Sequence, residues 1–233
     1  MEVEEPNKFI DILLKNKVLE HLISILYKLN DDENPEDVQI VSDILSVLEN
    51  FLEFYPQSAT ILCEKTKILS YLIKRVKIKN NTISQNQLFA SEILVMLIQN
   101  STENQILMGK YDGIAHLLKI LNNYCKKDPD SELEQELLKN IIDVLCCCLL
   151  VRDNQTIFRQ IEGIDLMVKF TKENKVIRHV AIKVLDYATQ NSFKNCKYLV
   201  EIDGLKSVFS YFMGKGFKNT KSSKIKVKYN YNN

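Results

Sequence analysis

Apolar residues recur at helical spacing along most of the chain. A clear case follows Ser131, where they come three, four or seven positions apart and so share one side of a helix. Glycine and proline, which interrupt helices and form tight turns, number only 6 and 4 among 233 residues. The pattern therefore predicts an all-α fold. The apolar positions after Ser131 are Leu133, Leu137, Leu138, Ile141, Ile142, Leu145 and Leu149.

Three segments repeat one arrangement, at residues 103–121, 153–170 and 195–212. Each has an asparagine nine positions before a glycine, an acid directly before that glycine, and Ile or Leu directly after it. We interpret the unit as a short helix, a tight turn and a second helix. The pairs are Asn104 and Gly113, Asn154 and Gly163, and Asn195 and Gly204, and the acids are Asp112, Glu162 and Asp203.

The glycine and the acid have different expected roles. Glycine adopts left-handed backbone angles at no steric cost, so Gly113, Gly163 and Gly204 are predicted to end the short helices as structural turn residues. The acid is expected to accept hydrogen bonds from the free N–H groups of the next helix and to interact favourably with its dipole.

The same slot can be followed upstream to Lys67 and Asn16, which gives five anchors spaced 51, 46, 50 and 41 residues apart. A period of about 40–47 residues, with two or three helices per unit, is typical of armadillo and HEAT repeats. A third, longer helix is predicted between anchors. Its start signals are Asn34 before Pro35, and the capping-box pairs Ser84 with Gln87 and Ser131 with Glu134.

These patterns predict an armadillo/HEAT-like, right-handed superhelical solenoid of about five repeats over residues 1–213. Each helix pair buries its apolar stripe only by stacking on a neighbouring unit. A disordered Lys/Asn/Tyr-rich basic tail is expected at residues 214–233. A four-helix bundle with extra helices is the competing fold, and it does not explain the recurrent asparagine–glycine spacing.

The charge is unevenly distributed. Residues 1–60 carry 4 basic and 13 acidic side chains, whereas residues 214–233 carry six lysines and no acid. Such asymmetry suggests contacts with proteins or nucleic acid. The acidic start resembles neither a secretory signal nor a transit peptide, and no apolar run approaches the ~18 residues of a membrane span. We therefore expect a nuclear or cytoplasmic protein with reduced cysteines and no membrane contact.

The search for catalytic chemistry is negative. His21, His116 and His179 are far apart and form no metal-binding pattern, and the chain has no phosphate-binding glycine loop, nucleophile elbow or dinucleotide fingerprint. Cys146, Cys147 and Cys148 point about 100° apart on a helix, so they cannot converge on one ion and are predicted to be small buried residues. We expect no enzyme activity, cofactor, metal or small-molecule substrate.

A candidate binding site lies on the predicted third helices, which line the concave groove of armadillo-type solenoids. Acids recur there, and one asparagine accompanies them. Carboxylates stepped along a groove can pair with the lysines and arginines of an extended basic peptide, while an asparagine fixes the peptide backbone. The alternative is that these groups are ordinary solvated or capping residues. The candidates are Glu49, Asn50, Glu53, Glu92, Asp143 and Asp186.

Several segments together resemble the beta-catenin-like protein 1 family of nuclear armadillo-repeat proteins. The match is collinear over about residues 7–213, and the family pattern extends beyond this chain at both ends. The most informative segments are LENFLEFYP (48–56), LSYLIKRVKIK (69–79), SEILVMLIQN (91–100), ENQILMGKYDGI (103–114), EQELLKNIIDVLCCCLL (134–150), AIKVLDYAT (181–189) and NCKYLVEIDGL (195–205).

The resemblance implies a spliceosome-associated scaffold or adaptor in the nucleus. Family members join a subcomplex with a Myb-domain splicing factor and a U-box ubiquitin-ligase scaffold, and they bind nuclear-localisation-type basic peptides in the solenoid groove. The expected partners are therefore splicing factors with basic segments, and direct nucleic-acid binding is not expected. Two alternatives remain: an RNA-contacting protein that uses the basic tail, and a generic cytoplasmic armadillo scaffold.

Overall fold

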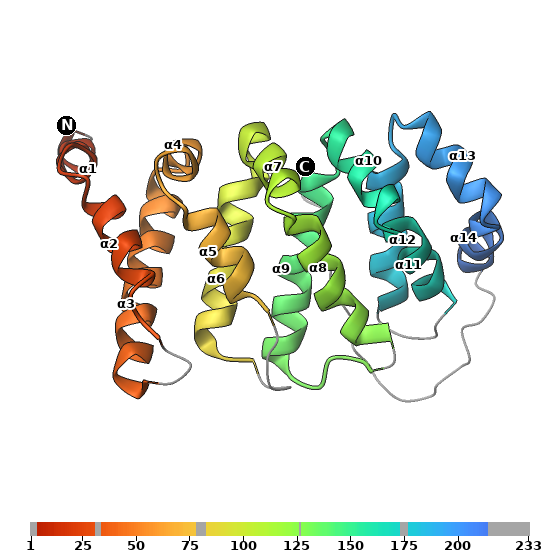
Figure 1. The fold of residues 1–233 in the computed structure, drawn as a ribbon, viewed down its shortest axis with the longest axis horizontal. Helices are drawn as coiled ribbons and strands as arrows, with labels where there is room; N and C mark the ends of the chain where they lie inside the picture. The colour runs from red at the N-terminus through yellow and green to blue at the C-terminus, as the bar shows by residue number, and fades with distance from the viewer. Residues whose placement is uncertain (1–3, 31–33, 78–82, 126, 173–176, 214–233) are drawn as a thin grey trace.

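The computed structural model describes residues 4–30, 34–77, 83–125, 127–172 and 177–213. In these residues the chain forms fourteen α-helices and one short 3-10 helix, without a strand. The helices follow one another along a single row from the N-terminal to the C-terminal end (Figure 1). The predicted all-α solenoid is confirmed.

Each complete unit of the row contains three helices, and four units are complete. The first and second helices are short, and the third is longer, as the sequence predicted. The units are α1 (Glu4–Lys15), α2 (Val18–Leu26) and α3 (Pro35–Phe54); α4 (Ser58–Lys65), α5 (Ile68–Arg75) and α6 (Gln85–Gln99); α7 (Thr102–Lys110), α8 (Gly113–Asn122), the 3-10 helix η1 (Asn123–Cys125) and α9 (Glu132–Cys148); and α10 (Arg152–Gln160), α11 (Gly163–Thr171) and α12 (Ile177–Thr189).

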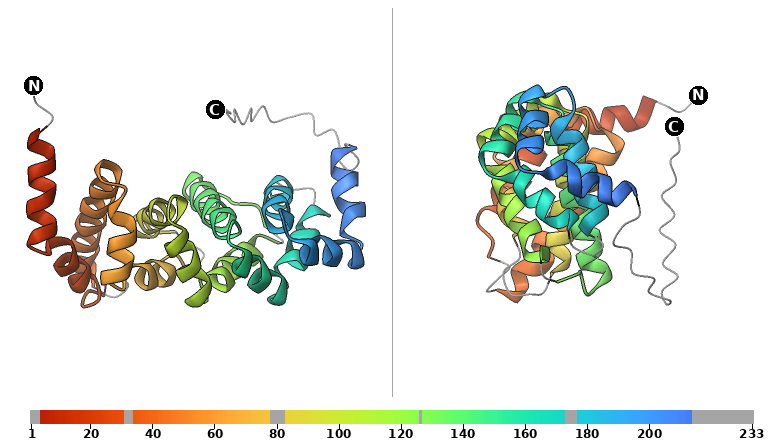
Figure 2. Two further views of the ribbon diagram at one scale, coloured as in Figure 1. Left: turned by 90° about the horizontal axis from the view of Figure 1, so that it is seen from above. Right: turned by 90° about the vertical axis from the view of Figure 1, so that its right-hand side faces the viewer.

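A fifth unit is represented by two helices, α13 (Phe193–Glu201) and α14 (Gly204–Phe212). Viewed from above, α1 and α14 project from the two ends of the row toward the side on which the third helices lie (Figure 2, left). Within the described ranges, the predicted five or so repeats correspond to four complete units and one with two helices. The predicted tail at 214–233 lies outside the described residues, so the division at residue 213 stays a prediction.

One continuous core runs through the row because each unit buries its apolar stripe against the next. The third helices α3, α6, α9 and α12 stack in sequence, and the second helices cover them from the other side. Leu94 and Leu97 on α6 and Leu145 on α9 are completely buried in this stack. The third helices therefore have one buried side and one side that faces away from the core.

Three buried asparagines tie neighbouring units together, and we call them the asparagine ladder. They are the repeat asparagines of the sequence, and each side chain is at most 2% exposed. Each Nδ2 donates to a carbonyl near the end of the preceding third helix and to a carbonyl of the preceding first helix. The bonds are Asn104 to Leu97 O (2.8 Å) and Ala59 O (3.1 Å), Asn154 to Cys148 O (2.9 Å) and Gln105 O (2.7 Å), and Asn195 to Ala188 O (2.7 Å) and Gln155 O (3.0 Å).

The roles predicted for the turn residues are wrong. The left-handed residue is the acid, with φ of 55° at Asp112, 62° at Glu162 and 58° at Asp203, and none of the three makes a side-chain capping hydrogen bond. The glycine is instead the first residue of the second helix, where space is short. A Cβ on Gly163 would lie 2.5 Å from the ring of Phe158, so glycine is required for close approach of the two helices.

Gly113 and Gly204 are crowded in the same way, by Met108 and Leu199 respectively. The upstream anchors also shift by one or two residues. In the first unit the left-handed residue is Lys17, and α2 begins at Val18 rather than at Asn16. In the second unit Lys67 has φ −96°, so its turn contains no left-handed residue at that position. The first unit therefore closes its turn with a left-handed residue as the later units do, but without the glycine, and the second unit closes it differently.

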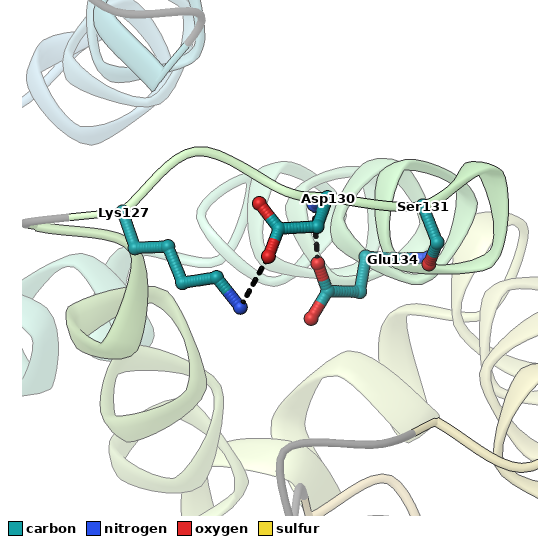
Figure 3. A network of polar contacts seen from close by, with 4 residues as sticks. All are labelled: Lys127, Asp130, Ser131 and Glu134. Atoms are coloured by element: carbon teal, nitrogen blue, oxygen red, sulfur yellow. Dashed lines mark hydrogen bonds and ion pairs between the residues drawn. The ribbon is translucent and has the colours of Figure 1, made fainter.

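Two of the three predicted helix starts are confirmed in full. Asn34 Oδ1 accepts a hydrogen bond from the backbone N–H of Glu36, and Ser84 and Gln87 form a reciprocal capping box. The third start makes only one of the two hydrogen bonds of a capping box (Figure 3). Ser131 Oγ accepts from the N–H of Glu134 at 3.1 Å, but the Glu134 carboxylate accepts from the N–H of Asp130, one residue before the N-cap. Asp130 also pairs with Lys127 at 2.8 Å.

No helix in the described ranges combines the length and the apolar character that crossing a membrane requires.

Candidate functional site

The exposed sides of α3, α6, α9 and α12 form a surface that we call the third-helix face. All six predicted site residues lie on these four helices. Glu49, Glu92 and Asp143 are half-buried, and the other three side chains are exposed. Glu49, Asn50 and Glu53 are on α3, Glu92 is on α6, Asp143 is on α9 and Asp186 is on α12.

Among the carboxylates of the predicted site residues, that of Glu92 has the largest shift in pKa. Partial burial raises its pKa first, and the negative charges of Glu49 and Glu136 raise it further, to about 6. The charges of carboxylates on three successive third helices therefore act on one another. A cation placed among them would relieve both the desolvation and the repulsion.

Glu49 shows the same effect one helix earlier. Burial and the charge of Glu53, one helical turn away, raise its pKa above the ordinary value. Asn50 does not point freely into the face, because its Nδ2 donates to Ser46 O of its own helix at 2.7 Å. Its side-chain oxygen is the group that remains for a ligand.

Glu136 is a member of this site that the sequence hypothesis missed. It lies on α9, four residues before Asn140, whose side chain is hydrogen-bonded to Ser91 on α6. Glu136 and Asn140 therefore share the side of α9 that is turned to α6. Its spacing of seven residues from Asp143 is the sequence signal that could have found it, whereas Glu134 points to the opposite side and is buried. We call Glu49, Glu53, Glu92 and Glu136 the acidic cluster.

Asp143 lies two turns after Glu136 along the same side of α9, and it already has a cationic partner. Lys183 Nζ of α12 approaches Asp143 Oδ1 to 2.7 Å, with both side chains partly exposed. Burial lowers the pKa of Lys183, but the hydrogen bond and charge of Asp143 outweigh burial and leave the pKa above its ordinary value. Asp186 lies three residues after Lys183 and is exposed. The predicted acids thus do not form one uniform track.

The asparagine ladder shows which positions are equivalent on successive third helices. The third-helix carbonyls that accept the ladder bonds belong to Leu97, Cys148 and Ala188. Five residues before each of them stand Glu92, Asp143 and Lys183. The charge at this position is negative on α6 and α9 and positive on α12.

The histidines and cysteines make no site in the described part of the chain, where no group of three potential metal ligands comes together. His21 and His116 each donate from Nδ1 to the carbonyl of a left-handed turn residue, Lys17 or Asp112. Cys146 and Cys148 are buried as predicted, whereas Cys147 is half-buried. Burial raises the pKa of Cys146 to about 12, so its thiol is unreactive at neutral pH.

Stacked three-helix units with long third helices on one side define an armadillo-type helical repeat protein. Comparison with known proteins agrees with this class. The family described as "Catenin-beta-like, Arm-motif containing nuclear" matches residues 1–231. The chain belongs to this family, as the resemblance implied.

Individual relatives support the assignment. Beta-catenin-like protein 1 of Homo sapiens and that of Rattus norvegicus are each 36% identical to the chain over 206 residues, which cover 88% of the chain and 36% of the relative. A homolog from Schizosaccharomyces pombe is 32% identical over 194 residues, covering 82% of the chain and 34% of the relative. The chain thus spans about a third of the length of these relatives. The family is one of armadillo-motif proteins, which act as scaffolds for protein interaction.

Proposed function

We propose that the chain is a non-enzymatic scaffold whose third-helix face, at α3, α6 and α9, binds a basic segment of a partner protein. The observation that carries the proposal is the acidic cluster. Burial of Glu92 and the negative charges of Glu49 and Glu136 raise its pKa. Binding of lysine or arginine side chains would replace this repulsion with attraction.

The spacing of the helices suits an extended peptide. Packed helices have axes ~8–10 Å apart, and an extended chain advances ~3.3 Å per residue. A cation at about every third residue would therefore meet Glu49, Glu92 and Glu136 in turn. Lysine and arginine also have long apolar stems, which can lie along half-buried side chains such as Val95 and Met96 on α6.

The proposed setting is the nucleus. The description of the family includes the word nuclear, and the relatives are beta-catenin-like protein 1 proteins. Following the family resemblance, we propose that the partners are pre-mRNA splicing factors with nuclear-localisation-type basic segments. Tagged chain excluded from nuclei would contradict this setting.

The affinity of a synthetic peptide tests the proposal. The probe is a labelled peptide with three lysines at every third position, titrated against the full chain at low salt and followed by fluorescence anisotropy. The double variant Glu49→Lys/Glu92→Lys should reduce the affinity by about a hundredfold, since it removes two attractions and adds two repulsions, each worth ~0.5–1 kcal/mol at exposed sites.

A matched control separates the site from net charge. Glu64 on α4 and Asp128 in the loop before α9 are exposed and lie outside the third helices. The variant Glu64→Lys/Asp128→Lys has the same net charge as the first double variant, and we expect it to change the affinity no more than about threefold. Equal losses in the two variants would mean that the peptide responds only to total charge, and the proposed site would then be wrong.

A further inference from the structure

The position of Lys183 has a consequence for the length of peptide that the third-helix face can hold. Lys183 stands on α12 at the position that Glu92 has on α6 and Asp143 has on α9. Its Nζ lies 2.7 Å from Asp143 Oδ1, so Asp143 is already paired with a cation. A cation of a bound peptide at Asp143 would have to displace Lys183 or lie beside it. Displacement loses an ion pair, and a second cation beside Lys183 is repelled.

The acidic cluster has the opposite character. Glu136 is on the side of α9 turned to α6, and its charge acts on Glu92. Asp143 lies on the same side of α9 but seven residues, or about 10 Å, nearer its C-terminal end, and its partner is on α12. The two carboxylates of α9 therefore belong to different parts of the face, one open to an external cation and one supplied with a cation by the chain itself.

We infer that Lys183 sets the C-terminal limit of the peptide-binding face, because it takes the place at Asp143 that a further basic residue of the peptide would otherwise occupy. This inference rests on the proposed function. It makes Lys183 a specificity-determining residue: the face selects a basic segment that spans α3, α6 and α9 and gains nothing from additional cations toward α12.

Two peptides test the inference on the full chain. The short peptide has three lysines at every third position, and the long peptide continues the same spacing by two lysines at each end, so that its direction on the face does not matter. In the parent protein the long peptide should bind no more than about twofold tighter than the short one. In Lys183→Met, which frees Asp143, the long peptide should bind about three- to fivefold tighter than the short one, as expected for one surface ion pair.

Lys139→Met is the control for a simple change of local charge. Lys139 lies on α9 between Glu136 and Asp143 and is exposed. Its removal should tighten both peptides by the same factor, so the ratio of their affinities stays that of the parent. Lys183→Met should raise the ratio, and adding Asp143→Asn to it should return the ratio to the parent value.

The outcomes separate this inference from the proposed function. If Glu49→Lys/Glu92→Lys abolishes binding but Lys183→Met leaves the ratio unchanged, the peptide site stands and the role of Lys183 is wrong. A long peptide that already binds the parent more than about threefold tighter also overturns the limit. If neither peptide binds the parent or Lys183→Met, the proposed function fails and the inference fails with it.

Discussion

Asn154 donates its side-chain amide to the carbonyl of Gln105, at 2.7 Å across the boundary between two units, and to Cys148 O of the preceding third helix. Its side chain is 2% exposed, so neither carbonyl can turn to water if the amide is removed. The asparagines of the repeat, which the sequence shows only as a spacing, therefore hold first helices to the preceding unit and fix the register of the third-helix face.

Replacing Asn154 by alanine should strongly destabilise the fold. Two hydrogen bonds to buried carbonyls are lost, and Cys148 O keeps a second donor in the N–H of Val151, so we expect a loss of ~1–3 kcal/mol in the free energy of unfolding. Chemical denaturation followed by circular dichroism measures it. Asn100→Ala, at an exposed position that ends α6, is the control and should change stability by less than ~0.5 kcal/mol. Similar losses in the two variants would show that the ladder bonds contribute little.

Glu162 and Gly163 should respond in opposite ways to substitution. Gly163→Ala should destabilise by ~1–3 kcal/mol, because the new Cβ lies 2.5 Å from the Phe158 ring. Glu162→Gly should be neutral or stabilising by up to ~1 kcal/mol, because glycine adopts φ 62° without strain. Thermal unfolding of the two variants beside the parent tests this, and a stabilised Gly163→Ala would contradict the crowding.

Glu92→Gln should change how stability depends on pH. The pKa of Glu92 in the fold, about 6, lies above its ordinary value of 4.5, so the folded chain keeps the proton to higher pH than the unfolded chain. The stability that this proton contributes is fully present below pH 4.5 and is lost as the pH rises through 6. The glutamine variant avoids the loss.

We therefore expect Glu92→Gln to melt above the parent at pH 7.5 and with the parent at pH 4.5. Water screens a half-buried carboxylate, so the gain should be below ~1 kcal/mol, or about 2 °C or less in Tm. Glu64→Gln, at an exposed position, is the control and should shift little at either pH. A Glu92→Gln variant that gains stability only at pH 4.5 would show that the sign of the pKa shift is wrong.

The cysteines should differ sharply in reactivity. Cys196 is exposed, Cys147 is half-buried, and Cys63, Cys125, Cys146 and Cys148 are buried. Burial raises the pKa of Cys63 to about 12, which suppresses its thiolate. Titration of the native chain with a disulfide reagent should therefore show one rapidly reacting thiol, and this reaction should be absent in Cys196→Ser. Several rapid thiols in Cys196→Ser would indicate a looser core.

The sequence predicts the repeat better than it predicts the contacts within it. Helical periodicity and the start signals at Asn34 and Ser84 are local, so the three-helix units follow from them directly. The spacing identifies the glycines, but the left-handed backbone angles predicted for them belong to the acids that precede them. The crowding between Gly163 and Phe158, which explains the glycine, arises only when two helices pack together.

The candidate site shows the same limit. Glu49, Asn50, Glu53, Glu92, Asp143 and Asp186 were placed on third helices correctly, since position along a helix is readable from the spacing. Which carboxylates and lysines of neighbouring helices meet there depends on the stacking of the units. The spacing of seven residues puts Glu136 on the side of Asp143, but its effect on Glu92 of α6 and the pairing of Asp143 with Lys183, 40 residues away, could not be predicted.

The most direct test of the account is to locate the bound peptide. A three-lysine peptide with a photoreactive group at its centre, cross-linked to the full chain and mapped by mass spectrometry, should mark residues on α3, α6 and α9 near Glu49, Glu92 and Glu136. Excess unlabelled peptide should remove these cross-links. Specific cross-links that gather instead on α12 to α14, or on the first and second helices, would contradict the third-helix face as the binding site.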